Sequence, residues 1–405
     1  MDQIQPGSRL KFRKLEMRKE KLGLVVGVKE TGEFISLDSL GEYTLRLLMD
    51  GLSVGETETA LSAQGHEANV RSFVSSIKDL GFAEISDSTN GGNADWDVRS
   101  ENELGAHRLP FLVILIAWII FISYAVSRIV YNPTIMYSAI GSLWKLNFVV
   151  FYLLIYAIFF LDGMIHESFH YLTAKLFGVP AKIGLSVRLF EPVLQTDLHS
   201  LWGVNKKKRY IVLLSGLMWD SFALSLFILA RSYFQLSPII NTILSGFIFL
   251  NIMVIISEFF FFTRTDVYFV VETALDCSNL RGDSMNYQKF VWRNIFRKFQ
   301  GSNQKPPLSN PLKDLSSREE SIVRTYSWFM ILSSVIVIVF GYLISFWGVV
   351  GILIGTFQQL IMGILIRNSF DLIIGAAGSG IFLFNIAFPI YFYLKQWKRT
   401  KSLVN

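Results

Sequence analysis

The order of apolar and polar residues divides the chain into a mixed N-terminal part and a long, strongly apolar remainder. Beyond residue 110, about seven apolar segments are each long enough to cross roughly 30 Å of hydrocarbon. They lie near 111–131, 147–165, 210–230, 239–262, 326–346, 347–366 and 372–394. This pattern predicts a polytopic α-helical membrane protein with about six or seven spans.

The first 85 residues follow a different pattern. Short strand-like runs come first, at 10–15, 24–28 and 33–36, and apolar stripes with helical spacing follow near 40–48, 56–64 and 70–80. Strands followed by short helices predict a small α+β, winged-helix-like domain over residues 1–85. The next stretch, 86–109, is polar and rich in Gly and Asn, so we expect a flexible linker.

Beyond the linker we expect three parts, namely a membrane core at 110–285, a basic amphipathic cytosolic loop at 286–324 and C-terminal spans at 325–405. The loop opens with aromatic residues at helical spacing, interleaved with Lys and Arg. This combination is typical of a helix at a membrane surface. We therefore expect membrane lipids, and no nucleic acid, as partners of this segment.

Composition and charge support a membrane location. The chain is 52% hydrophobic and only 17% charged, which excludes an ordinary soluble protein. Basic clusters at 206–209 and 281–313 predict cytosolic loops and, with them, a cytosolic N-terminal domain. The basic end at 395–401 is also expected in the cytosol, so with an odd number of spans one late segment is re-entrant or two merge. Cys277 is the only cysteine, which excludes an intramolecular disulfide.

The motif His166-Glu167-Ser168-Phe169-His170 follows the apolar run 148–161 and holds two of the five histidines. Helical spacing puts His166 and His170 on one face, where two imidazole nitrogens can hold one Zn²⁺. Glu167 beside them can take a proton from zinc-bound water, which makes it the candidate catalytic residue. Ionisable groups in a membrane segment are unfavourable unless paired, hydrated or metal-bound, which favours a metal site.

A catalytic zinc needs about three protein ligands, so another residue must complete the site. Asp266 is the candidate, because it comes directly after a long apolar segment. Asp162 lies about one turn before His166 and could orient it or replace Asp266 as ligand. Asp220 lies within an apolar segment and has the same two alternatives, and Glu258 is a weaker candidate of the same kind. His199 is a possible substrate contact.

The spacing HExxHxxxAxxxG, completed by Ala174 and Gly178, resembles the motif of site-2-protease-type intramembrane zinc metallopeptidases. Ser215-Gly216 resembles the small-residue segment of these enzymes. The resemblance implies a third zinc ligand from a motif NxxPxxxLDG, and Asp266 resembles its aspartate. This chain lacks the glycine after that aspartate, and the asparagine and proline before it.

The chain also resembles a narrower branch of these metallopeptidases. The segments 192–202, 266–268 and 278–281 are similar to peptide zinc metallopeptidases of bacterial ribosomal-peptide gene clusters, and 30–37, 47–51 and 80–82 resemble the PqqD-like peptide-recognition fold. The resemblance implies a multi-pass protein of the bacterial plasma membrane and a precursor-peptide substrate, whose leader adds a strand to a sheet edge. It also implies an ABC exporter or a modifying enzyme of the same cluster as partner.

The sequence thus predicts a zinc-dependent membrane endopeptidase that matures or helps export a ribosomally made peptide. Two alternatives stay open. One is regulated intramembrane proteolysis of a membrane-anchored signalling protein. The other is a non-catalytic peptide-binding export or immunity protein with a structural or degenerate metal site.

Overall fold

The computed structural model describes residues 4–20, 23–28, 33–66, 69–86, 96–98, 108–188, 191–260, 262–277, 279–299, 310–313 and 315–404. The chain divides into two compact units. The first comprises Met1–Phe111, Ala174–Lys182 and Asp197–Arg209. The second comprises Leu112–Thr173, Ile183–Thr196 and Tyr210–Asn405.

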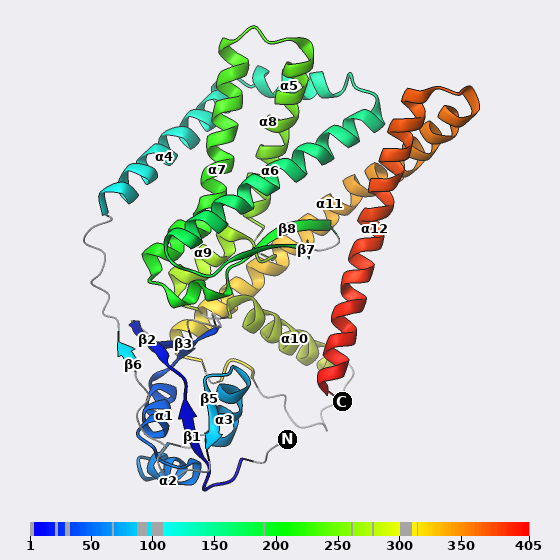
Figure 1. The fold of residues 1–405 in the computed structure, drawn as a ribbon. Helices are drawn as coiled ribbons and strands as arrows, with labels where there is room; N and C mark the ends of the chain where they lie inside the picture. The colour runs from blue at the N-terminus through cyan, green and yellow to red at the C-terminus, as the bar shows by residue number, and fades with distance from the viewer. Residues whose placement is uncertain are drawn as a thin grey trace. The chain divides into compact units, whose positions relative to one another are not determined.

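The N-terminal residues of the first unit form two small sheets and three helices (Figure 1). One sheet pairs β1 (Arg9–Phe12) antiparallel with β5 (Ala83–Ser86). The other has the order β4 (Glu33–Leu37), β3 (Gly23–Val28), β2 (Leu15–Glu20), β6 (Trp96–Val98), in which β6 is parallel to β2. The helices are α1 (Ser39–Met49), α2 (Val54–Ala63) and α3 (Val70–Asp79).

Apolar residues of these strands and helices form one core, whose most buried members include Leu15, Val26, Leu48, Val74 and Phe82. Polar side chains fix where each helix begins, because they accept hydrogen bonds from the free backbone N–H groups of the first turn. Asp38, Ser53 and Asn69 cap α1, α2 and α3 in this way. The expected N-terminal region of strands and helices is thus confirmed.

The strand expected at 10–15 and the expected linker differ in part from the structure. The strand expected over residues 10–15 is two strands in different sheets, because Arg13 N still bonds to Phe82 O beside β5 whereas β2 pairs with β3. Of the expected linker, residues 87–95 and 99–107 lie outside the described part of the chain. Within it, Trp96–Val98 forms β6.

The rest of the chain is mostly helical (Figure 1). Its helices are α4 (Arg108–Tyr131), α5 (Thr134–Leu143), α6 (Phe148–Leu176), α7 (Lys206–Tyr233), α8 (Pro238–Glu258), α9 (Asp266–Leu275), α10 (Leu280–Phe299), α11 (Ser317–Ile366) and α12 (Ser369–Val404). Between α6 and α7 lie the paired strands β7 (Lys182–Arg188) and β8 (Glu191–Asp197) and the short helix η2 (His199–Gly203).

Among the described residues, five helical segments are long and apolar enough to cross a membrane. They are Phe148–Leu176, Lys206–Tyr233, Pro238–Glu258, Gly348–Ile366 and Ser369–Lys398. A bent pair, Leu115–Tyr131 and Thr134–Leu143 at 84°, raises the number to six if it counts as one span. Large apolar side chains such as Ile239 and Leu365 are 74% and 72% exposed, as expected for a surface that faces lipid. The chain is a helical multi-pass membrane protein.

The two late segments expected as separate spans, 326–346 and 347–366, lie on one uninterrupted helix, the 50-residue α11. The chain then reverses at Arg367, and α12 packs against α11. The two helices approach closely at Gly375, where a Cβ would lie 2.3 Å from the backbone nitrogen of Leu360. Small residues allow such close helix packing in membrane proteins.

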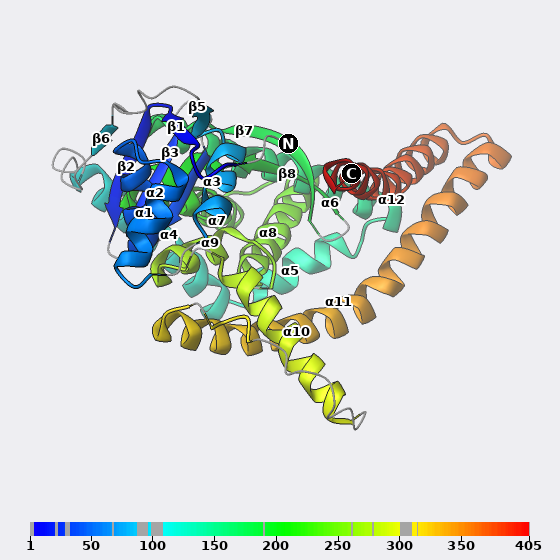
Figure 2. The ribbon, with the colours of Figure 1, turned by 90° about the horizontal axis from the view of Figure 1, so that it is seen from below.

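The helices α9, α10 and α11 share a second apolar cluster, which includes Tyr268, Cys277, Leu280, Leu312 and Val323. Figure 2 shows α10 crossing the first part of α11, where Gln288 Nε2 donates a 2.9 Å hydrogen bond to Ser327 Oγ. Cys277 is 5% exposed. Burial raises the pKa of its thiol to about 11.

Cys277 should therefore react slowly with N-ethylmaleimide. The thiolate is the reacting species, and a thiol with a pKa of about 11 stays almost wholly protonated at pH 8. We expect labelling of the folded protein in detergent to be at least about 100-fold slower than after denaturation. The control is a variant with Cys277→Ser and the exposed Ser62→Cys, which should react rapidly in both states. Equal labelling rates of the folded and the denatured wild type would contradict the burial of Cys277.

Candidate metal centre

Helix α6 brings the two histidines of the motif together inside the second unit. His166 and His170 are four residues apart, which is about one helical turn, and they are only 8% and 2% exposed. Their Nε2 atoms lie 3.1 Å apart. Two imidazole nitrogens at this distance face a common point rather than the lipid.

Asp266, the first residue of α9, adds a carboxylate to this pair. Its Oδ2 atom lies 3.1 Å from His166 Nε2 and 2.8 Å from His170 Nε2. The three atoms form a nearly equilateral triangle. Zn²⁺ bonds of about 2.0–2.1 Å place tetrahedral ligands roughly 3.3 Å apart, so a small expansion of this triangle would suit the ion. Among the described residues, these three side chains are the group that could hold a metal.

Hydrogen bonds on the far side of each imidazole leave both Nε2 atoms available as metal ligands. His170 Nδ1 lies 2.7 Å from the carbonyl oxygen of Val212, which can only accept, so Nδ1 carries the proton. His166 Nδ1 lies 2.9 Å from Asp220 Oδ2, which orients it in the same way. In each neutral ring the lone pair is then on Nε2, toward Asp266. Such partners are typical of histidines that bind metal.

Helix α7 leaves space beside the cluster because residue 216 is glycine. A Cβ at Gly216 would lie 2.3 Å from His166 Nε2 and 2.5 Å from His170 Nε2. Both distances are far below a normal van der Waals contact, so a side chain here would push the two imidazoles from their positions.

The end of α8 holds Asp266 in place. The Glu258 side chain is buried, and its Oε2 accepts a 2.8 Å hydrogen bond from the backbone N–H of Asp266. Thr265 caps α9 and donates to the backbone oxygen of Glu258 at 2.7 Å.

Glu167 is fixed by the strand β8. Its Oε2 accepts a 2.7 Å hydrogen bond from the backbone N–H of Thr196, and the Thr196 hydroxyl donates to the backbone oxygen of Glu167 at 3.0 Å. These two contacts tie the motif helix to the β7–β8 pair. The Oε1 atom is the part of the carboxylate left to face a reacting group.

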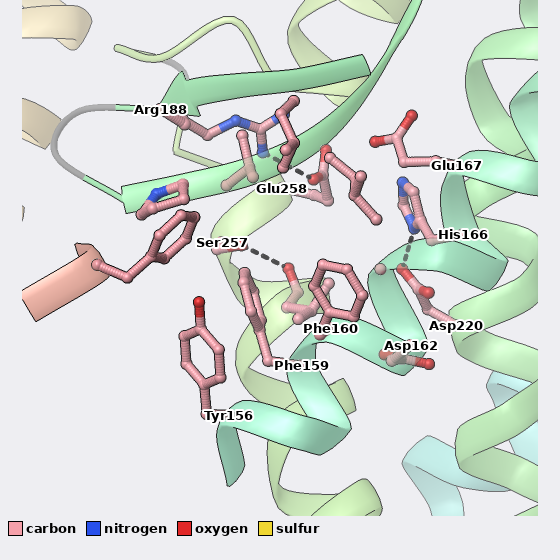
Figure 3. Close-up of a pocket in the computed structure, with 17 residues that line it drawn as sticks. Tyr156, Phe159, Phe160, Asp162, His166, Glu167, Arg188, Asp220, Ser257 and Glu258 are labelled. Atoms are coloured by element: carbon pink, nitrogen blue, oxygen red, sulfur yellow. Dashed lines mark hydrogen bonds and ion pairs between the residues drawn. The ribbon is translucent and has the colours of Figure 1, made fainter. Parts of the chain in front are cut away.

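Both His166 and Glu167 line a cavity of about 300 Å³ within the second unit (Figure 3). Figure 3 shows Tyr156, Phe159 and Phe160 along α6 on one side of it. Arg188, from β7, lies on the opposite side, with its Nη1 atom 3.7 Å from Glu258 Oε1. The candidate metal centre therefore opens onto a space large enough for part of a small molecule or peptide.

The other candidate residues from the sequence, Asp220, Asp162 and His199, differ in how they contact the donor triangle. Asp220 contacts His166 through Nδ1, on the side away from the donor triangle. Asp162 accepts a 3.1 Å hydrogen bond from Asn251 instead of contacting a histidine. His199 is exposed and bonds to the neighbouring Asp197. Its suggested contact with substrate stays a prediction.

Two contributors had no assigned role in the sequence analysis. Arg188 and Thr196 reach the site through the pairing of β7 with β8, which no local motif signals. Glu258 was detectable in the sequence, because an acidic residue near the end of the apolar segment 239–262 is unfavourable without a partner. The contact of Glu258 with Asp266 depends on the turn that follows α8.

Comparison with known proteins finds no matching family model, no matching curated protein and no matching solved structure. Two imidazole nitrogens and one carboxylate oxygen suit a borderline divalent ion such as Zn²⁺, and an adjacent carboxylate suits proton transfer.

Replacing Gly216 with alanine should empty the site without unfolding the helix. The added Cβ would lie within 2.5 Å of both Nε2 atoms, whereas alanine favours a helix by about 1 kcal/mol over glycine. We expect less than a tenth of the wild-type zinc per chain by elemental analysis, with the helical circular dichroism signal in detergent unchanged. Gly141→Ala is the control, since a Cβ there meets no atom within 4 Å. Full zinc content in Gly216→Ala would rule out this placement of the ion.

Asp220→Asn should weaken metal binding while keeping the shape of the side chain. Loss of such an outer partner typically lowers metal affinity about 10-fold to 100-fold. Competition with a chelator in detergent measures the change. Asp162→Asn serves as control and should have a smaller effect, because Asp162 bonds to Asn251. Equal losses in the two variants would contradict a specific role for Asp220.

Proposed function

We propose that this chain is a zinc-dependent endopeptidase that works within the membrane. The single observation that carries the proposal is the triangle of His166, His170 and Asp266 donor atoms, 2.8–3.1 Å apart, with Glu167 next in sequence on an apolar helix. A purely structural role would not need a carboxylate beside the donors or a cavity reaching them. Both are present.

The residues fit the metal by donor type, by the orientation of the two imidazoles and by the space at Gly216. When bound, zinc supplies a Lewis acid that polarises a peptide carbonyl and makes water a better nucleophile at neutral pH. His166, His170 and Asp266 hold the ion, and Asp220 and the Val212 carbonyl orient the imidazoles.

Glu167 is the proposed general base. It takes a proton from the attacking water at Oε1 while Oε2 stays bonded to the Thr196 N–H. The protonated carboxyl then gives that proton to the amine leaving group, which restores the starting state. Water and an unwound stretch of substrate must both reach this point, and the cavity beside His166 and Glu167 provides the space.

The proposed substrate is a ribosomally made precursor or modified peptide. The N-terminal strands and helices would act as a PqqD-like domain that holds the peptide leader as an added strand. The proposed setting is the bacterial plasma membrane, with the N-terminal domain in the cytosol. An ABC exporter or modifying enzyme of the same cluster is the proposed partner. Cleavage of a membrane-anchored signalling protein would use the same centre.

The first test is the zinc content of the purified protein. We expect about one zinc per chain in the wild type and close to none in His166→Ala, His170→Ala and Asp266→Ala, since about three protein ligands are needed. Elemental analysis of each variant in detergent, at matched folding by thermal unfolding, gives the answer. Zinc retained without Asp266 would exclude it as a ligand, and a wild type reconstituted with zinc that binds none would reject the proposal.

Glu167→Gln separates an enzyme from a binding protein. Glutamine keeps the size of the side chain but cannot accept the proton, so hydrolysis should fall at least about 100-fold while zinc is retained. Product formation from a peptide mixture is measured by mass spectrometry. Glu320→Gln, at the start of α11, is the control and should cleave as wild type. Unchanged cleavage by Glu167→Gln would contradict the assigned base.

A further inference from the structure

The cavity beside His166 and Glu167 has walls that are suited to one kind of side chain. We propose that it binds a large apolar side chain of the substrate next to the bond that is cut, and that Gly163 sets the size of this side chain. The inference rests on the proposed peptidase function and names a substrate class for it. This cavity lies next to the proposed reaction site, because His166 and Glu167 line it.

The walls are mostly aromatic and aliphatic. The apolar lining side chains are Tyr156, Phe159, Phe160, Leu185, Pro192, Val193, Leu194, Val254 and Phe384. An apolar cavity of about 150 Å³ accommodates benzene in another protein. The volume of about 300 Å³ here therefore has room for a Phe, Tyr, Leu or Met side chain together with adjoining backbone.

Four charged groups around the cavity, Arg188, Glu258, Asp162 and Asp220, each contact another polar group. Arg188 lies 3.7 Å from Glu258, whose other oxygen accepts the Asp266 N–H. Asp162 and Asp220 are almost fully buried, and they bond to Asn251 and His166. A charged substrate side chain would lose its hydration here and compete with these existing contacts. An apolar side chain loses no favourable hydration, and its burial stabilises the complex.

Gly163 is the position that leaves this space open. It lines the cavity three residues before His166, so both lie on the same face of α6. A Cβ added at Gly163 would meet no atom within 4 Å. A larger side chain at this position can therefore enter the cavity without displacing a neighbour, and it would take the place of the substrate side chain.

The test compares cleavage sites in a defined mixture of synthetic peptides that carry every residue type. Cut positions are read by mass spectrometry for wild type, Gly163→Leu and Gly141→Leu. Gly141 is the matched control, a helical glycine on α5 with equally open surroundings that does not line the cavity. We expect wild type to favour Phe, Tyr, Leu or Met over Ala by about 10-fold to 100-fold in kcat/KM at one position beside the cut.

In Gly163→Leu the preference at that position should change to Ala, Gly or Ser, measured as the ratio of cleavage rates between peptides within the same variant. Gly141→Leu should retain the wild-type preference. Cleavage without a size preference, a preference for charged residues, or an unchanged preference in Gly163→Leu would overturn the inference while leaving the peptidase intact. No cleavage by zinc-loaded wild type would reject the proposed function, and the inference with it.

A binding measurement provides a readout separate from turnover. Fluorescein-labelled forms of one cleaved peptide, with Phe or Ala at the selected position, are titrated with Glu167→Gln in detergent and followed by polarisation. We expect the Phe peptide to bind at least about tenfold more tightly than the Ala peptide. Adding Gly163→Leu to Glu167→Gln should abolish this difference. A difference that survives the added leucine would overturn the assignment of Gly163.

Discussion

Ionisable groups inside a membrane helix must find partners, and this requirement organises the centre of the second unit. Besides Glu167, which β8 holds, the apolar helix α6 carries three ionisable groups that are each met by a group from another helix. Asp162 is met by Asn251, His166 by Asp220 and Asp266, and His170 by the Val212 carbonyl and Asp266. These contacts join α6 to α7, α8 and α9. The same polar groups that would destabilise a lone helix in lipid therefore hold the four helices in register.

Residues that are not candidate metal ligands also position the site, and they do so on two sides of it. Glu258 and Thr265 do not touch a histidine, yet they fix the backbone of Asp266 and so the third corner of the donor triangle. The β7–β8 pair acts on the other side, through Thr196 on Glu167 and Arg188 on Glu258. One short strand pair thus contacts both the residue proposed to carry the proton and the residue that holds the third ligand. The geometry of the site therefore depends on these supporting contacts as well as on the candidate ligands.

Local pattern was enough to predict the parts of this site that one helix determines. The spacing of His166 and His170 defines a face, whereas Asp266 was one acidic candidate beside Asp162 and Asp220, and only the fold brings its carboxylate to the two histidines. Contacts made by pairing between distant segments were not accessible, so Arg188 and Thr196 had no assigned role. The apolar pattern alone does not distinguish two adjacent spans from the single helix α11. The basic C-terminal end did indicate that one late segment is re-entrant or that two merge, and 326–346 and 347–366 lie on one helix. The N-terminal strands were predictable as strands but not in their division between two sheets.

The hydrogen bond that β8 donates to the Glu167 carboxylate comes from a peptide N–H and not from a side chain. A backbone donor is present in every amino acid except proline, so replacement of Thr196 by almost any residue leaves this hydrogen bond chemically possible. The sequence of the strand is then free to vary toward other demands, such as the shape of a bound peptide, without loss of the carboxylate's anchor. The side chains of this seven-residue strand can thus change while the contact that holds the Glu167 carboxylate persists.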